Sequence, residues 1–158
     1  MRWFLIDKVT EFAPGERARG TKNVTLTDEV LHDHFPDHPI FPGVLVVEGM
    51  AQLAGFLIEM SVNRPEERPR RALLTQIREA KFHDTSGPGD RLEFEVRISS
   101  VLGAAAQVTG EATADGRRIA RAELTFFLKD VESERVHEQR RNLYTLWTRD
   151  LKLDRPIL

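Results

Sequence analysis

The sequence of 158 residues contains no cysteine, which excludes disulfide bonds, thiolate metal ligands and a cysteine nucleophile. It also has no strong excess of charge of one sign, because 23 Lys and Arg side chains and 25 Asp and Glu side chains give a net charge of −2. This balance predicts no general attraction to nucleic acid or to an anionic membrane. The first apolar residues are interrupted by Asp7 and Lys8 and lack a secretory pattern. We expect a cytoplasmic protein with one main domain.

No long uncharged apolar run, internal repeat or glycine-rich phosphate loop is present, so neither a membrane span nor a nucleotide cofactor is predicted. The most apolar segment, from Gly43 to about Met60, is interrupted by Glu48, Gln52 and Glu59. A membrane span would need about 20 largely uncharged residues. Since apolar residues occur on nearly every face of the segment, it predicts a helix buried on all sides in a protein core.

Strand patterns flank this helix. Two strands are expected near residues 6–12 and 17–25, and four more near 73–82, 92–98, 105–114 and 117–128. Asp115-Gly116 predicts a tight hairpin between the last two, and residues 63–71 are expected to form an exposed linker. The order predicts an α+β fold, in which a curved antiparallel sheet wraps around one long central helix.

Residues 131–158 carry apolar side chains at near-helical spacing among many charges. We expect a C-terminal extension with a helix that packs on the body or on a partner subunit. A solvated tail is the alternative.

Three groups with chemical uses lie close together in the sequence. His34, in a proline-rich loop, can move a proton near neutral pH. Gly43 follows Pro42 at the start of the helix, where free backbone N–H groups can hold an oxyanion. Glu48 lies in apolar surroundings with Gln52 one turn later on the same face, and can act as an acid. A purely structural role remains possible for two of these groups. Pro-Gly often begins a helix without binding a ligand, and the Glu48 carboxylate could be paired with an arginine in the core.

A metal site is the main competitor for His34. The run 32–38 contains three histidines and approaches a di-zinc hydrolase pattern, but its spacing differs by one residue. Few further ligands remain beyond His83 and His137. We therefore expect no metal, and we interpret His32 and His38 as loop histidines.

Three runs resemble the signature of the 3-hydroxyacyl-(acyl-carrier-protein) dehydratases of bacterial fatty-acid synthesis, FabZ type: His34-Phe35-Pro36-Asp37-His38-Pro39, Pro42-Gly43-Val44-Leu45 and Glu48-Gly49-Met50-Ala51-Gln52. The resemblance covers about residues 2–129. It implies a hot-dog fold for a domain spanning 1–130, and leaves the extension 131–158 outside the family.

The resemblance also implies roles. His34 would be the catalytic base and Glu48 the acid that yields a trans-2-enoyl thioester from a (3R)-hydroxyacyl thioester on an acyl carrier protein. The Gly43 amide would hold the thioester oxygen and Gln52 would support Glu48; the neighbouring substrate-binding residues are Phe41 and Pro42. The base, the acid and the Gly43 amide need no metal for the dehydration, and no cofactor is expected. In the family the active site forms across a homodimer interface, and trimers of dimers are frequent.

The sequence departs from the family pattern at several positions. Asp33 and Gly49 stand where glycine and alanine are usual, and Lys81 stands where arginine is frequent. Leu73 and Leu74 lie where many relatives have a tunnel tyrosine, which leaves the shape of the acyl tunnel open.

An acidic carrier protein would need a basic docking surface. Its candidate residues are Arg64, Arg68, Arg70 and Arg71, with a solvated linker as the alternative. Two other functions remain possible for a hot-dog protein: an acyl thioesterase, and a non-catalytic partner subunit.

Overall fold

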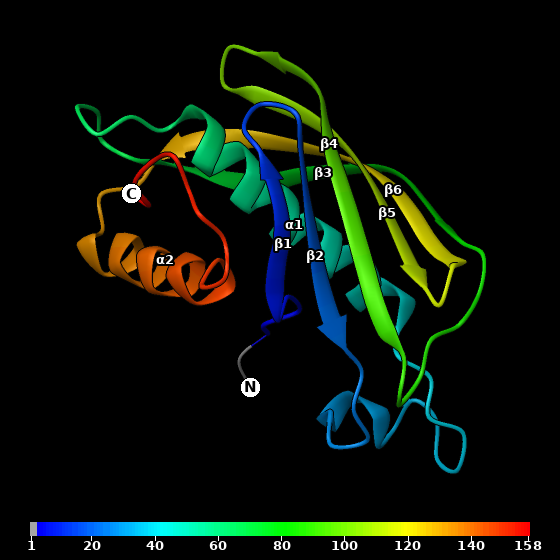
Figure 1. Cartoon of the computed structure of the whole chain (residues 1–158). Helices are drawn as coiled ribbons and strands as arrows, with labels where there is room; N and C mark the ends of the chain where they lie inside the picture. Colours follow the sequence, from blue (N-terminus) through cyan, green and yellow to red (C-terminus); the bar gives the residue numbers. More distant parts are fainter. Residues whose placement is uncertain (1–2) are drawn as a thin grey trace.

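The computed structural model describes residues 3–158, in which one curved six-stranded antiparallel sheet wraps around a long helix (Figure 1). The strands lie in the order β1-β2-β4-β5-β6-β3. The elements are β1 Lys8–Ala13, β2 Arg17–Asn23, the 3-10 turn η1 Glu29–Leu31, α1 Gly43–Val62, β3 Arg70–Phe82, β4 Arg91–Leu102, β5 Ala105–Ala114, β6 Arg117–Asp130 and α2 Glu134–Trp147. The architecture confirms the α+β fold expected from the sequence.

Helix α1 is the centre of the core. Leu53, Phe56 and Leu57 have no exposed surface, because the sheet curves around the helix. The helix is long and apolar enough to cross a membrane, but 78% of its most apolar window is buried inside the fold. Its apolar character is therefore explained by burial in the core, as the absence of a single apolar face predicts.

The predicted hairpin is confirmed, and the predicted linker is partly wrong. Asp115 and Gly116 have φ angles of 50° and 76° between β5 and β6, the left-handed conformation that a two-residue turn requires. The segment expected to be an exposed linker ends earlier than predicted, because β3 already begins at Arg70. Arg71 pairs there with Lys129 of β6.

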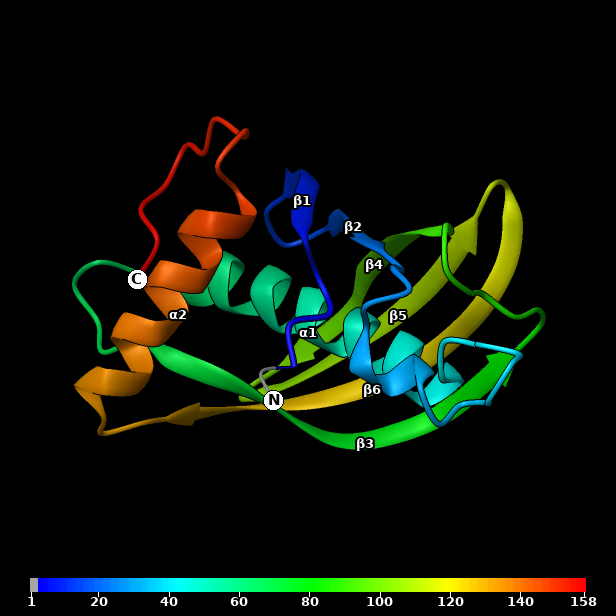
Figure 2. The same cartoon turned by 90° about the horizontal axis from the view of Figure 1, so that it is seen from below.

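The C-terminal segment packs against the body, as Figures 1 and 2 show. The Ser133 hydroxyl accepts a hydrogen bond from the Val136 N–H and caps the start of α2. Tyr144 and Trp147 are buried, and their rings lie edge-on to Phe56 of α1, with centroids 5.1 and 6.4 Å away. These contacts join the extension to the C-terminal half of the central helix.

A buried polar cluster ties the same elements together. The Arg71 guanidinium donates to Glu59 Oε2 at 2.8 Å, and each residue is only 2% exposed. Arg71 also donates to His137 Nδ1 and to the main-chain oxygen of Leu158. The Tyr144 hydroxyl donates to Glu59 at 2.9 Å, and burial together with this carboxylate raises the pKa of Tyr144 well above its usual value. The hydroxyl therefore remains a donor.

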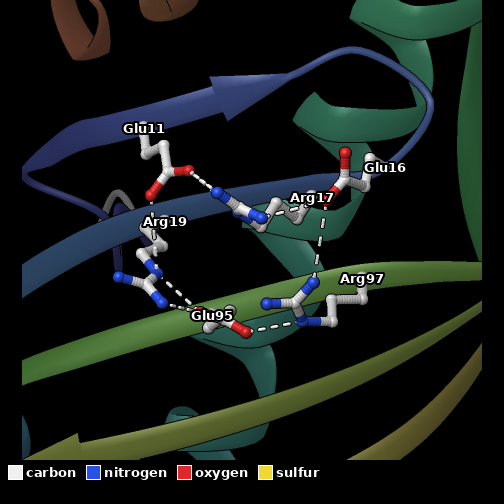
Figure 3. Close-up of polar contacts among 6 residues, drawn as sticks. All are labelled: Glu11, Glu16, Arg17, Arg19, Glu95 and Arg97. Atoms are coloured by element: carbon white, nitrogen blue, oxygen red, sulfur yellow. Dashed lines mark hydrogen bonds and ion pairs between the residues drawn. The ribbon is translucent and has the colours of Figure 1, made fainter.

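The outer face of the sheet carries exposed ion pairs that cross β1, β2 and β4 (Figure 3). Glu95 accepts from Arg19 at 2.5 Å and from Arg97 at 2.6 Å. Partial burial acts to raise the pKa of Glu95, but these two hydrogen bonds lower it. Exposed pairs of this kind contribute about 0–1 kcal/mol each. These pairs therefore add little to the stability of the sheet.

Candidate functional site

The loop that carries His34 lies between η1 and α1 and is closed by main-chain hydrogen bonds. Phe35 and His38 exchange N–H to C=O bonds of 3.1 and 3.0 Å, and the Ile40 N–H donates to the His34 carbonyl at 2.8 Å. Asp37, within this turn, has a φ of 60°. These bonds hold His34 in a defined position directly before the central helix.

One nitrogen of His34 is fixed by the backbone. Nδ1 lies 2.8 Å from the carbonyl oxygen of Ile40. A carbonyl can only accept, so in the neutral ring Nδ1 carries the hydrogen and Nε2 keeps its lone pair. The half-buried imidazole also stacks on the Phe35 ring, with centroids 4.3 Å apart. The local structure thus holds His34 as a base with Nε2 as the accepting atom.

Gly43 starts α1 beside an aromatic ring. Pro42 is the N-cap, and its carbonyl accepts from the Leu45 N–H at 2.9 Å. Within residues 3–158, none of the hydrogen bonds uses the N–H of Gly43. A Cβ at this position would lie 2.7 Å from the ring of Phe82, so glycine allows β3 to approach the helix start closely. This N–H is available to a polarised carbonyl oxygen.

Glu48 is held by Gln52, the contact that their spacing on the helix predicts. Gln52 Nε2 donates to Glu48 Oε1 at 3.0 Å, and both side chains are half-buried. Gly49 faces β4, where a Cβ would meet the Phe94 ring at 2.7 Å. Glycine at this position therefore lets the Phe94 ring pack directly against the helix backbone.

Phe41 and Pro42 are both buried directly before the helix. The Phe41 N–H donates to the Ser86 carbonyl at 2.7 Å. Phe41 also lines a hollow of about 270 Å³ together with Leu45 and the N-terminal residues 3–5. The two residues thus shape the surroundings of the helix start.

His34 and Glu48 are not joined to one another within one chain. Among the described residues 3–158, no hydrogen bond connects them or bridges them through a third side chain. The loop histidine and the helix carboxylate are each placed by their own neighbours. A site that uses both needs a substrate between them or a second copy of the chain.

The docking role predicted for Arg71 is wrong, because this side chain is buried and paired with Glu59. Arg64 and Arg68 are exposed and Arg70 is half-buried, but all precede or begin β3. They follow the C-terminal end of α1, and 20 helical residues, about 30 Å, separate that end from Gly43. The structure therefore does not bring this segment to the helix start.

The remaining histidines of the loop are exposed. His32 and His38 both lie at the surface. Across residues 3–158, no group of three or more His, Asp or Glu side chains is arranged to hold a metal ion.

Two hydrogen bonds of the site were not predicted from the sequence. Gln52 is held by the main chain of residues 3–5: the Leu5 N–H donates to Oε1 at 3.0 Å, and Nε2 donates to the Trp3 carbonyl at 2.8 Å. Backbone groups occur at every position, so no residue type signals such a contact.

Comparison with known proteins gives the family. Residues 2–123 match the model of the FabA-like domain. The dehydratase named 3-hydroxyacyl-(acyl-carrier-protein) dehydratase FabZ from Bacillus velezensis is 40% identical over 126 residues, which are 80% of this chain and 87% of the relative. The protein of the same name from Campylobacter lari is 38% identical over 129 residues, 81% and 88% of the two chains.

The fold has solved counterparts. A hot-dog-like protein from Thermanaerovibrio acidaminovorans superposes with a TM-score of 0.61 at 18% identity, covering 90% of this chain and 96% of that one. The resemblance read from the loop and helix motifs is confirmed by these matches. The chain belongs to the FabA-like family of hot-dog proteins, in the FabZ group of 3-hydroxyacyl-(acyl-carrier-protein) dehydratases.

Proposed function

We propose that this chain removes water from a (3R)-hydroxyacyl thioester, carried by an acyl carrier protein, to give the trans-2-enoyl thioester. The names of the relatives in Bacillus velezensis and Campylobacter lari support this reaction. The residue arrangement supports it independently, because elimination requires a base, an acid and a donor for the thioester oxygen.

His34 is the proposed base. Its Nδ1 is occupied by the Ile40 carbonyl, so Nε2 accepts the proton from C2 of the substrate. The electrons of the C2–H bond form the C2=C3 double bond while the C3–O bond breaks. Negative charge that develops on the thioester oxygen is stabilised by the Gly43 N–H at the positive end of α1.

Glu48 is the proposed acid. Its carboxyl group gives a proton to the departing C3 hydroxyl, which leaves as water. The proton taken by His34 returns through solvent to Glu48 before the next turnover. The base, acid and donor together account for every proton and electron pair in the reaction.

The tautomer of His34 set by Ile40 is the observation that carries this proposal. The test is an assay of the purified protein with carrier-bound (3R)-hydroxyacyl substrates of graded chain length. We expect an enoyl thioester, detected by mass spectrometry as a loss of water with the thioester intact. Release of free carrier thiol would identify a thioesterase, and an unchanged substrate would identify a non-catalytic subunit.

We propose that the working protein is a homodimer paired along β3, an edge strand of the sheet. Directly paired strand residues point to the same face. Leu124 and Phe126 of β6 are 1% and 2% exposed, but their β3 partners Ile77 and Leu74 are 49% and 39% exposed. The inner face of β3 is therefore apolar and uncovered, next to an edge that can accept another strand.

Ile77→Asp is expected to convert the dimer largely to monomer and to remove activity with it, because a charge would be buried at the β3 interface. Sedimentation velocity and turnover check this result. The matched control is Leu73→Asp, also on β3 and 45% exposed, but paired with Phe127 on the outer face. If the Ile77→Asp variant remains a dimer, β3 is not the interface.

The acyl carrier protein is the proposed partner, and the cytoplasm the proposed location. The names of the relatives support the first, and the burial of the only membrane-length helix in residues 3–158 supports the second.

A further inference from the structure

The side-chain amide of Gln52 makes three hydrogen bonds, of which two go to main-chain groups far away in the sequence. Oε1 accepts from the Leu5 N–H at 3.0 Å. Nε2 donates to the Trp3 carbonyl at 2.8 Å and to Glu48 Oε1 at 3.0 Å. The N-terminal segment and the candidate acid are thus joined through one amide group.

These partners fix the orientation of the amide by their chemistry. A backbone N–H can only donate and a backbone C=O can only accept. Turning the Gln52 amide by 180° would place NH₂ against the Leu5 N–H and oxygen against the Trp3 carbonyl, and would lose both bonds. Only the observed orientation satisfies residues 3–5, and in it an N–H always faces Glu48.

The segment is itself anchored to the sheet. Leu5 is 7% exposed. The Asp7 N–H donates to the Thr21 carbonyl at 2.8 Å, and the Asp7 carboxylate accepts from the Asn23 N–H at 2.7 Å. Because β2 holds the chain directly after Leu5, the two groups that contact Gln52 occupy fixed positions.

We propose, resting on the dehydration proposed above, that the main chain of residues 3–5 is a positioning element of the active site. It locks the Gln52 amide so that its NH₂ group binds Glu48 Oε1 and never presents an oxygen there. Oε1 then serves as the acceptor of the carboxyl group, and the acidic proton resides on Oε2. In the reaction the Oε2–H bond breaks, its proton joins the C3 hydroxyl, and Glu48 is left as carboxylate.

The test is a double-mutant cycle on kcat with the unchanged 158-residue chain as reference. One change deletes residues 2–4, which removes the Trp3 carbonyl, and the other is Gln52→Ala. Each alone is expected to lower kcat about 10- to 100-fold with KM changed by less than about twofold, because a misplaced acid slows the chemical step. The two together are expected to be no slower than Gln52→Ala alone, because the segment acts only through the amide.

The cycle separates positioning from structural support. If the effects on kcat multiply, residues 3–5 act by another route and the inference fails. The control is Leu102→Ala, which removes an exposed apolar side chain at the end of β4 and is expected to keep kcat within about twofold. If the wild-type enzyme does not dehydrate the carrier-bound substrate, the proposed function fails instead.

A second variant covers the case in which the deletion does not fold. Gln52→Glu keeps the side-chain shape and the bond from the Leu5 N–H, but the segment then holds a carboxylate oxygen against the Trp3 carbonyl and Glu48. We expect kcat about tenfold below that of Gln52→Ala, since a carboxylate held at this place opposes the negative charge that Glu48 gains as it gives up its proton. Equal kcat values for the two variants would show that residues 3–5 do not lock the group.

Discussion

His34→Ala is expected to lower kcat for dehydration by about 10²- to 10⁴-fold, the usual contribution of a positioned general base. The loop does not need the imidazole to keep its shape. It is closed by main-chain hydrogen bonds between Phe35 and His38 and from Ile40 to His34. Loss of the ring removes one hydrogen bond, to the Ile40 carbonyl. The variant should therefore fold and assemble while its steady-state turnover collapses.

Two controls accompany this substitution. His32→Ala removes an exposed imidazole from the same loop and is expected to leave kcat within about twofold. Sedimentation and thermal unfolding establish that the His34 variant remains assembled. A folded His34→Ala protein with near wild-type turnover would contradict the assignment of the base.

Mixed dimers give a second test, because no hydrogen bond joins His34 to Glu48 within the described part of one chain. If each site takes His34 from one subunit and Glu48 from the other, a dimer of His34→Ala with Glu48→Ala contains one intact site. Random pairing makes half of the dimers mixed, so equal co-expression is expected to restore about a quarter of wild-type activity. A site within one chain would restore none.

The fold was predictable where the pattern is local. The apolar run that begins at Gly43 predicts α1 because it is too uniform for an amphipathic surface helix, and the Asp115-Gly116 pair predicts the β5–β6 hairpin. The linker prediction failed at Arg71 for a non-local reason. The partner of Arg71 is Glu59, and a charge cluster in the sequence does not reveal which of its members is buried.

The candidate site was predictable to the same extent. The side chains of His34 and Glu48 and the glycine at the helix start are visible as residue types in an informative order. A core carboxylate satisfied by an arginine was also foreseen, but for Glu48 rather than Glu59, where it occurs. The hydrogen bonds from residues 3–5 to the Gln52 side chain could not be predicted, because residues 3–5 contribute only backbone groups to them.

Arg71→Ala is expected to destabilise the protein by about 3–5 kcal/mol, the usual result of removing one partner of a buried ion pair. The Glu59 carboxylate would keep the Tyr144 hydroxyl and the Ala72 N–H, but it would lose its only cation within the described residues. For a chain of this length the loss corresponds to a fall in Tm of about 6–20 °C. Urea unfolding at a fixed protein concentration measures it, since the proposed dimer would make stability depend on concentration.

Two comparisons show whether charge is the cause. Arg68→Ala breaks a surface pair with Glu132, in which Arg68 is 60% exposed, and is expected to cost about 0.5 kcal/mol or less. Adding Glu59→Gln to Arg71→Ala should recover part of the loss, because a neutral amide is cheaper to bury without a cation. If the double variant is no more stable than Arg71→Ala, the lost stability comes from the cavity left by the guanidinium rather than from the unpaired charge. Since Arg71 contacts the C-terminal end of α1, the fraction that stays folded should keep its kcat, the reverse of the result expected for His34→Ala.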